Sequence, residues 1–310
     1  LLRLLPIQYL GQHRQTSNMK VTLKTKIIAA VLTAILATPF SVEAVVIPEG
    51  RATSGDLTIT TLRTEDTVKS GITVHSLSGT SSTPVSSVSG FAVGDYVLLI
   101  QMSTTTSNSG RYEFQKLRAV TGSSLFFYEN LTNTYGSNTA TKAQVIKVNE
   151  YHDVMVSTGG IWRPSAWDGT SGGVLVAILN GGLTINGGTV AATSTGFGGG
   201  AGESNSGLDA FQGNSASTTG VRSISANGSG GGGGVDNCGG PSAVGGGGGG
   251  YGAGGSNGGT SVCSGNVGEG GKTAGSTTLE SGGLILGGGG GGGSCVSASC
   301  TGTSGATGGG

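Results

Sequence analysis

Short stretches of alternating apolar and polar residues recur along residues 45–157, and they predict β-strands. Residues 56–60 alternate strictly, and Phe91–Met102 contains an almost unbroken apolar run that predicts a buried strand. Further strands are predicted near residues 112–120, 125–128 and 143–148. Many short strands between polar turns predict a small β-barrel or β-sandwich, and no helix start follows residue 44. The fold class expected for the chain is therefore all-β.

Residues 158–195 form a β-rich junction with a different pattern. Short apolar segments at 174–179, 183–185 and 189–192 alternate there with Asn-Gly-Gly turns that begin at Asn180 and Asn186. Such turns are typical of β-hairpins and also of the corners between rungs of a β-solenoid. Three segments are too few to choose between the two, so we expect β-solenoid-like hairpins in this junction.

Residues 196–310 are dominated by glycine. The chain has 310 residues and 65 glycines, of which 46 lie in this region. Uninterrupted runs occupy Gly230–Gly234, Gly245–Gly250 and Gly287–Gly293. One interpretation is a flexible linker, because glycine loses the most backbone entropy when it is ordered. The other is a packed polyglycine-II-like array, in which extended chains without Cβ atoms approach closely and share backbone hydrogen bonds.

The four cysteines favour the ordered array, because a linker needs none. Cys238, Cys263, Cys295 and Cys300 all lie in the glycine-rich region. In an exported protein they predict two disulfides, which would reduce the entropy of the unfolded chain. Three connectivities are open, of which sequential pairing, Cys238 with Cys263 and Cys295 with Cys300, is our expectation. A zinc site is disfavoured because no CxxC pair and no nearby histidine is present.

The start of the chain predicts export. Residues 1–18 precede the first methionine and are interpreted as upstream, non-native sequence, and residues 19–44 match a bacterial signal peptide. Lysines precede an apolar run at 27–40, and the small-x-small pattern ending at Ala44 predicts cleavage after that residue. An uncleaved N-terminal anchor is the alternative, although the run is short for a transmembrane helix. The expected localisation is secreted or cell surface, with no transmembrane span in the mature chain.

Charge argues against nucleic acid as a partner. Residues 1–44 hold five of the 16 basic residues and one of the 16 acidic residues, so the remainder has a net charge of about −4. Nucleic-acid binding needs a clustered basic surface, which this remainder lacks. Glycans, the cell surface or an extracellular matrix are the partners that stay open.

Catalytic motifs are weak, and the sequence predicts no enzyme, cofactor or metal site. His152 lies beside Asp153, but strand-end placement explains it better than catalysis. A glycosidase pair would have to come from scattered acidic residues, which usually mark turns and solvated faces of β proteins. Those acids are Asp95, Glu113, Glu129, Glu150, Asp153 and Asp168. The densest aromatic group is Tyr151, Trp162 and Trp167, a candidate partner-binding surface that could equally plug the end of a barrel.

Four motifs carry a resemblance to a known group of proteins. They are GDYVLLIQM at 94–102, GRYEF at 110–114, QVIKVNEY at 144–151 and AWDGTSGG at 166–173. In this order they resemble the N-terminal module of large glycine-rich secreted surface proteins of Gram-negative bacteria, some of them labelled adventurous-gliding-motility or adhesin-like proteins. The resemblance covers roughly residues 85–255, and it implies a cell-surface or secreted role without catalytic residues. The glycine runs separately resemble the glycine sandwich of certain phage tail-tip adhesins.

Together these observations predict three parts after residue 44. They are a β-domain at 45–157, the β-rich junction at 158–195 and a disulfide-tied glycine-rich region at 196–310. The leading hypothesis is an exported, non-enzymatic structural or adhesive protein. The alternatives are an extracellular carbohydrate-binding or carbohydrate-active protein that uses the Trp162–Trp167 surface, and an ice- or surface-binding protein that uses threonine-rich β faces or glycine helices.

Overall fold

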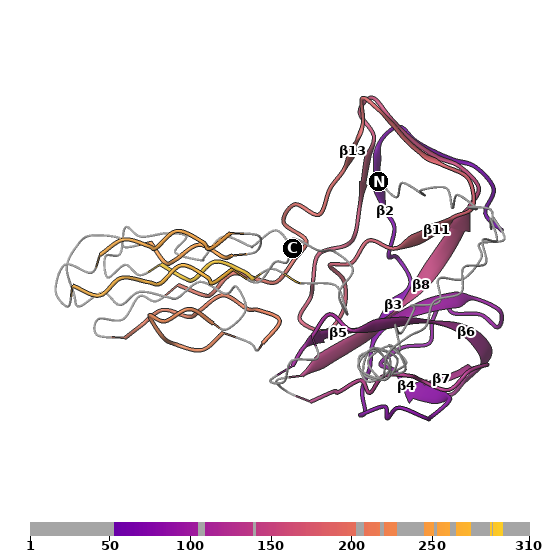
Figure 1. Cartoon of the computed structure of the whole chain (residues 1–310), viewed down its shortest axis with the longest axis horizontal. Helices are drawn as coiled ribbons and strands as arrows, with labels where there is room; N and C mark the ends of the chain where they lie inside the picture. The colour runs from indigo at the N-terminus through magenta and orange to yellow at the C-terminus, as the bar shows by residue number, and fades with distance from the viewer. Residues whose placement is uncertain are drawn as a thin grey trace, which may run out of the picture. The chain divides into compact units, whose positions relative to one another are not determined.

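Every regular element that the structure describes is a β-strand, which confirms the all-β prediction (Figure 1). The structure is a computed structural model, and it describes residues 53–104, 109–138, 141–202, 208–217, 220–227, 245–250, 253–260, 265–273, 286 and 288–293. No helix among these residues is long and apolar enough to cross a membrane. The strands are β1 (Leu57–Ile59), β2 (Leu62–Thr64), β3 (Lys69–Gly71), β4 (Ser82–Pro84), β5 (Tyr96–Ser103), β6 (Tyr112–Thr121), β7 (Ser124–Phe127), β8 (Lys142–Tyr151), β9 (Val154–Ser157), β10 (Ile161–Arg163), β11 (Ala177–Leu179), β12 (Leu183–Asn186) and β13 (Thr189–Val190).

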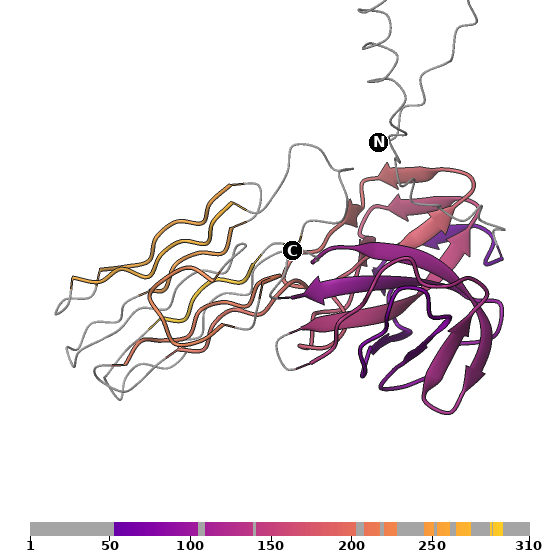
Figure 2. The ribbon, with the colours of Figure 1, turned by 60° about the horizontal axis from the view of Figure 1, so that its bottom comes forward.

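The largest sheet is mostly antiparallel and curls like part of a barrel (Figure 2). Its strand order is β11-β8-β5-β6-β7-β4, and β3 pairs with β8 on the edge opposite β5. The two ends of this order, β11 and β4, do not pair with each other. Between β3 and β4 there is only a single isolated bridge, Ile72 to Val85, so no continuous ladder among the described residues closes the sheet. The prediction of a β-barrel or sandwich is thus correct in strand class and curvature, but the observed sheet is a half-barrel.

The surroundings of β5 explain why Val97 to Ile100 are all apolar. All residues of β5 after Tyr96 are buried. Val97 and Leu99 pack into one core cluster, and Leu98 and Ile100 pack into another on the opposite face of the sheet. A strand with a core on both faces reads as a continuous apolar run instead of an alternating one.

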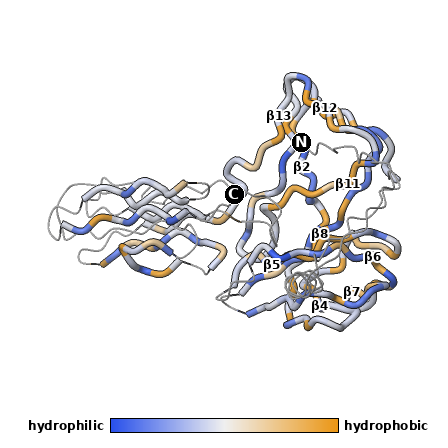
Figure 3. The backbone as a smooth tube through the Cα atoms, in the orientation of Figure 1, coloured by the Kyte–Doolittle hydropathy of each residue, from blue (hydrophilic) through white to orange (hydrophobic). Residues whose placement is uncertain are grey.

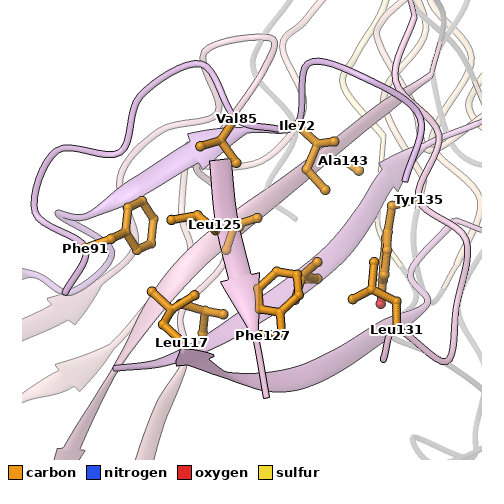
Figure 4. Close-up of a cluster of buried hydrophobic side chains, with 12 residues drawn as sticks. Ile72, Val85, Phe91, Leu117, Leu125, Phe127, Leu131, Tyr135 and Ala143 are labelled. Atoms are coloured by element: carbon orange, nitrogen blue, oxygen red, sulfur yellow. The ribbon is translucent and has the colours of Figure 1, made fainter. Parts of the chain in front are cut away.

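The first of these cores lies inside the curl of the sheet (Figure 4). Phe127 and Leu125 from β7 meet Leu117 from β6, and loop residues including Leu131 and Tyr135 close the remaining side. All five side chains are buried. The core is therefore completed by connecting loops, in the place where a closed barrel would have further strands.

Three pairs of short strands stack on one another in parallel, and we call each pair a rung. The rungs are β1–β2, β9–β10 and β12–β13, and their strands form the sheets β1-β9-β12 and β2-β10-β13. A third set of parallel contacts joins β11 to the end of β8. The Asn-Gly-Gly turns of the junction therefore do not close antiparallel hairpins between β11, β12 and β13. The sequence could not reveal this arrangement because the parallel partners of β12 and β13 lie in other parts of the chain.

Glycine makes the corners of the rungs compact. Gly159 and Gly187 have φ angles of +82° and +74°, a backbone region that glycine enters without steric cost. A side chain on Gly160 or Gly188 would collide with the backbone of the strand in the neighbouring rung. Apolar side chains fill the space between the rungs, among them Ile59, Val154 and Val156.

Candidate functional site

Glycine-rich segments lie side by side and bond through their backbones. Three such segments, 245–250, 253–260 and 265–273, bond pairwise. The Gly248 N–H donates to the Ser256 carbonyl, the Gly255 N–H donates to the Gly271 carbonyl, and the Gly271 N–H donates to the Gly248 carbonyl, each at 2.8 Å. Each of the three segments therefore has two others as hydrogen-bonded neighbours. Figure 3 shows these segments mostly pale, because glycine is neither strongly apolar nor strongly polar.

A fourth segment, 288–293, has three neighbours and bonds to them with a period of three residues. The N–H groups of Gly288 and Gly291 donate to the 245–250 segment, at the carbonyls of Gly250 and Gly247. Those of Gly289 and Gly292 donate to the 211–214 segment, at the carbonyls of Asn214 and Phe211. In between, the Gly290 carbonyl accepts from the N–H of Gly200. The backbone hydrogen bonds of this segment therefore go to different neighbours at successive residues, and they return to the same neighbour after three residues.

Packing between these segments leaves no room for a Cβ atom at many positions. A Cβ placed on Gly255, Gly258 or Gly270 would lie within 3.0 Å of a backbone carbonyl oxygen of a neighbouring segment. At Gly245, by contrast, nothing lies within 4 Å. The glycines are therefore required individually by close backbone approach, and the requirement differs from one position to the next.

In the described part of the chain, a backbone hydrogen bond and an apolar contact join the glycine-rich region to the sheet. The Thr104 N–H, just after β5, donates to the Ala216 carbonyl at 2.9 Å. Phe197, which is buried, and Trp167 pack edge to face with ring centroids 5.7 Å apart. Phe197, Ala216 and the partly buried Leu286 belong to the same core cluster as Ile100 of β5. One core thus continues from the sheet into the start of the glycine-rich region.

A buried carboxylate forms hydrogen bonds with residues of β2, β8 and β10. Glu65 follows β2, and its side chain is 1% exposed. Its Oε1 accepts hydrogen bonds from Tyr151 Oη at 2.7 Å and Asn149 Nδ2 at 2.6 Å. Its Oε2 accepts from Trp162 Nε1 at 2.8 Å and from Arg63 Nε at 3.0 Å. Arg63 also donates to Tyr151 Oη at 2.7 Å, so every group in the network has a partner.

This network shifts the pKa values of its members. Burial raises the pKa of the Tyr151 hydroxyl to about 12, and the hydrogen bond and negative charge of Glu65 act in the same direction. Burial acts to lower the pKa of Arg63, but the hydrogen bond and charge of Glu65 outweigh it, so the pKa of Arg63 is raised overall. Both shifts stabilise the protonated donors around the carboxylate, as expected for a structural ion-pair network.

Of the three predicted partner-binding aromatic residues, two are enclosed by the rungs. Tyr151 and Trp162 are both buried and both hydrogen-bonded to Glu65, so neither presents a ring face at the surface. Trp167 is partly exposed and leans on Phe197. The structure thus brings Tyr151 and Trp162 together as interior residues, and it places Trp167 at the contact with the glycine-rich region.

The candidate acids are mostly engaged in holding loops. Buried Glu113 accepts hydrogen bonds from the backbone N–H groups of Thr132 and Asn133. Asp168 accepts from the N–H groups of Thr170 and Ser171 within its own turn. Burial acts to raise the pKa of Asp168, but these hydrogen bonds outweigh it and lower that pKa. Loop fixation of this kind agrees with the interpretation of scattered acids as turn formers.

One exposed group of titratable residues gathers at the start of the rungs. His152 Nδ1 lies 3.2 Å from an Asp56 carboxylate oxygen and 3.1 Å from an Asp153 carboxylate oxygen. Asp153 also accepts a hydrogen bond from the Gly182 N–H. All three side chains are exposed, and their ligand atoms lie within 4.8 Å of one another. The spacing would admit a cation, but each group already serves the corner between β8 and β9.

Two sets of sequence predictions have different outcomes here. The four cysteines, Cys238, Cys263, Cys295 and Cys300, lie outside the described residues, so their pairing stays a prediction. Sequence reasoning did not select Glu65, the residue on which the interior network converges. The available signal was the charged Arg63-Thr-Glu65-Asp66 sequence beside a strand, in a chain in which only 10% of residues are charged.

The chain was compared with known proteins. Neither a protein-family model nor a curated protein matches it. Among solved structures it is similar to three phage tailspikes over part of its length. The tailspike protein gp49 from Pseudomonas phage LKA1 has a TM-score of 0.22 and 15% identity, over 33% of this chain and 19% of that one. The Pseudomonas phage phi297 tailspike gp61 has a TM-score of 0.22 and 19% identity, over 31% and 16%.

The third is the gp54 tailspike of Acinetobacter baumannii bacteriophage AP22, solved in complex with A. baumannii capsular saccharide. Its TM-score is 0.24 and its identity 9%, over 42% of this chain and 28% of that one. The part matched is thus less than a third of the length of each of these tailspikes.

Proposed function

We propose that this chain is an exported, non-enzymatic structural protein of the cell surface or the extracellular space. Its β-strands form a base, and its glycine-rich region forms a rigid scaffold on that base that displays exposed surfaces to a partner. The proposal is carried by one observation, the period of three in the hydrogen bonds of Gly288–Gly292.

This period supports a packed polyglycine-II-like array in place of a linker. In a flexible linker the backbone amides bond to water and no individual glycine is required. Here successive amides point to different neighbouring segments, and a Cβ atom at Gly255, Gly258 or Gly270 would collide with a backbone carbonyl. Backbone hydrogen bonds take over the role that side-chain packing has in an ordinary core, which suits a region of low charge and few apolar side chains.

The rungs would give this scaffold a stiff base. We infer that β1–β2, β9–β10 and β12–β13 are three rungs of a short β-solenoid whose third face is formed by β11 and the end of β8. Such stacks bury a continuous column of side chains and resist local opening, because each rung bonds to the next along its whole backbone. Stiffness at the base is what a displayed array requires.

Export and crosslinking complete the proposal. The signal-like segment at 19–44 would deliver the chain to an oxidising compartment, where Cys238, Cys263, Cys295 and Cys300 would tie the glycine segments together. Peptide mass mapping of the secreted protein, with and without reduction, tests the cleavage after Ala44 and the pairing of the cysteines together.

Hydrogen exchange on the full chain tests the scaffold itself. The backbone amides of Gly289, Gly291 and Gly292 are expected to exchange at least about a hundredfold more slowly than in the unfolded chain, because each is bonded to a neighbouring segment. Exchange of these amides at the unfolded rate would refute the rigid array. The unfolded rates come from the same protein in denaturant, so that sequence effects on exchange cancel.

Of the three aromatic residues predicted to bind a partner, Trp167 alone is partly exposed. Tyr151 and Trp162 are enclosed, so a sugar contact within this group would have to use Trp167. A glycan array and a hydrolysis assay test this alternative. Binding that is lost in Trp167→Ala would favour it, and turnover abolished by one carboxylate substitution would refute the non-enzymatic proposal.

The ice-binding alternative needs a regular face that orders water. Along the outer side of the β1-β9-β12 sheet, Thr58 and Thr184 stand on either side of Met155, so the row of threonines is interrupted. A thermal-hysteresis measurement on the secreted chain decides this alternative, because an ice-binding protein must separate the freezing and melting points.

A further inference from the structure

The stack of rungs ends on β12 and β13, and this end is open. β12 and β13 are edge strands of their sheets, with β9 and β10 as their inner neighbours. Every residue of both strands is exposed. An edge strand offers a row of unpaired backbone N–H and C=O groups to any further strand that approaches it.

Apolar side chains that face into the column are uncovered at this end. Strand register places Leu183 over Val154, Ile185 over Val156 and Val190 over Trp162. The lower residue of each pair is buried, but Leu183, Ile185 and Val190 are 48%, 54% and 36% exposed. In the rung at the other end of the stack, the corresponding Ile59 is only 3% exposed. The column is therefore open on the β12–β13 side specifically.

The strands of the last rung are short, but they carry neither of the sequence devices that keep edge strands unpaired, a charge or a proline. Leu183–Asn186 and Thr189–Val190 contain no charged residue and no proline. Edge strands that must stay unpaired commonly carry an inward lysine, a proline or a bulge. A terminal rung of a solenoid likewise needs a polar outer layer to remain soluble alone. The composition of this rung is that of an interior layer.

The residues that follow the last rung do not cover it. After Val190 the chain turns back toward the sheet, where the Thr195 carbonyl accepts a hydrogen bond from the N–H of Trp167. Phe197 then enters the core cluster that contains Ile100. The continuation of the chain through residue 202 is thus used elsewhere and does not supply a covering layer.

We propose that the open end binds the same end of a second copy of this chain. The two β12 strands pair antiparallel about a two-fold axis that passes Thr184, with Leu183 of each copy opposite Ile185 of the other. In an antiparallel pair, directly opposed residues lie on the same side of the sheet, so this register joins inward residues to inward residues. A two-fold contact also brings each group near its own copy, which an uncharged surface tolerates and a charged one does not.

Disulfide trapping with a matched control tests this register. In Thr184→Cys the two introduced cysteines lie at the axis, at a Cα separation within the about 4.4–6.8 Å that a disulfide needs. In Met155→Cys, which is 38% exposed on the same outer face, the two cysteines are three strand spacings apart, about 14 Å. Mass mapping of the oxidised protein should therefore find a 184–184 link and no 155–155 link. A 155–155 link, or no 184–184 link, would overturn the proposal.

Sedimentation of the full chain provides an independent measurement. The unmodified protein is expected to dimerise, and Ile185→Lys is expected to weaken the dimer by about a hundredfold, because the charge enters a two-fold interface twice. Leu62→Lys is the control, since Leu62 is exposed to a similar extent, 53%, on the first rung and away from the proposed interface. A monomeric unmodified chain, or equal dimerisation of the Ile185→Lys and Leu62→Lys variants, would contradict the proposal. Circular dichroism of both variants verifies that they fold.

Discussion

The substitution of one packed glycine by alanine tests most directly whether the glycine-rich region is a packed array or a flexible linker. In Gly255→Ala the new Cβ would meet the Gly248 carbonyl oxygen, while the N–H of residue 255 is committed to the Gly271 carbonyl at 2.8 Å. Backbone lies on both sides, so the segment cannot move away from one neighbour without loosening the bond to another. Neither contact can be relieved by rotating a side chain.

The expected cost follows from overpacking and from the weakened hydrogen bond. Insertion of one methyl group into a well-packed region costs about 1–3 kcal/mol, and loss of one backbone hydrogen bond adds about 1 kcal/mol. Alanine also restricts the unfolded chain, which offsets about 0.4–1 kcal/mol. The free energy of opening of the glycine segments should therefore fall by about 1–3 kcal/mol in Gly255→Ala.

Gly245→Ala is the matched control in the same array. Nothing lies within 4 Å of a Cβ at residue 245, and its φ is not positive, so only the unfolded-chain effect remains. Its opening free energy should be unchanged or rise by up to about 1 kcal/mol. Native-state hydrogen exchange of the Gly289 and Gly291 amides measures both variants. Equal protection in Gly255→Ala and Gly245→Ala would refute individual packing of the glycines.

Three further predictions concern the base. Glu65→Leu leaves buried donors and the Arg63 charge without their acceptor, so the free energy of unfolding should fall by about 3–5 kcal/mol in denaturant titrations, against less than about 0.5 for exposed Glu129→Gln. The folded pKa of Tyr151, about 12, exceeds its unfolded value, so the contribution of Tyr151 to stability should be complete below about pH 10 and lost as the pH rises through 12. An absorbance titration of tyrosinate should show this high-pH step, and Tyr151→Phe should remove it. A wild-type titration without the step, or a Tyr151→Phe variant that retains it, would contradict the assignment. Trp167→Ala removes the ring that packs on Phe197 and should speed proteolysis of the glycine-rich region relative to the sheet; unchanged cleavage rates would exclude this contact as the link.

The strands of the curled sheet were predictable from local pattern alone. The apolar run that contains Tyr96–Ile100 corresponds to β5, and the patterns at 112–120 and 143–148 correspond to β6 and β8. Each of these strands has side chains in a core, so the pattern of apolar residues along the strand shows which positions are buried. It was not predictable that the sheet forms no closed barrel, because residues outside the strands, such as Leu131 and Tyr135, complete its core.

The interior network around Glu65 was not predictable for a different reason. Its donors Asn149, Tyr151 and Trp162 lie 84 to 97 residues further along the chain, and no local pattern relates them to a carboxylate. The same sequence separation made the structural role of Tyr151 and Trp162 unpredictable. Tyr151 and Trp162 were recognised as a group, but whether they face a partner or an interior acid depends on the stacking of rungs, which a single sequence does not specify.

The topology of the rungs also dictates an order of assembly. Residues 57–64 form the first rung, but their partners in β9 and β10 are synthesised only after strands β3 to β8 of the curled sheet, since Glu65 and Trp162 are 97 positions apart. Contacts of such long range close slowly, because the loop between them must be ordered first. We therefore expect the antiparallel pairs among β3 to β8 to form before the stack, since β8 leads directly into β9. Until then β1 and β2 lack their parallel partners, so during refolding the amides of the first rung should become protected from hydrogen exchange later than those of the sheet.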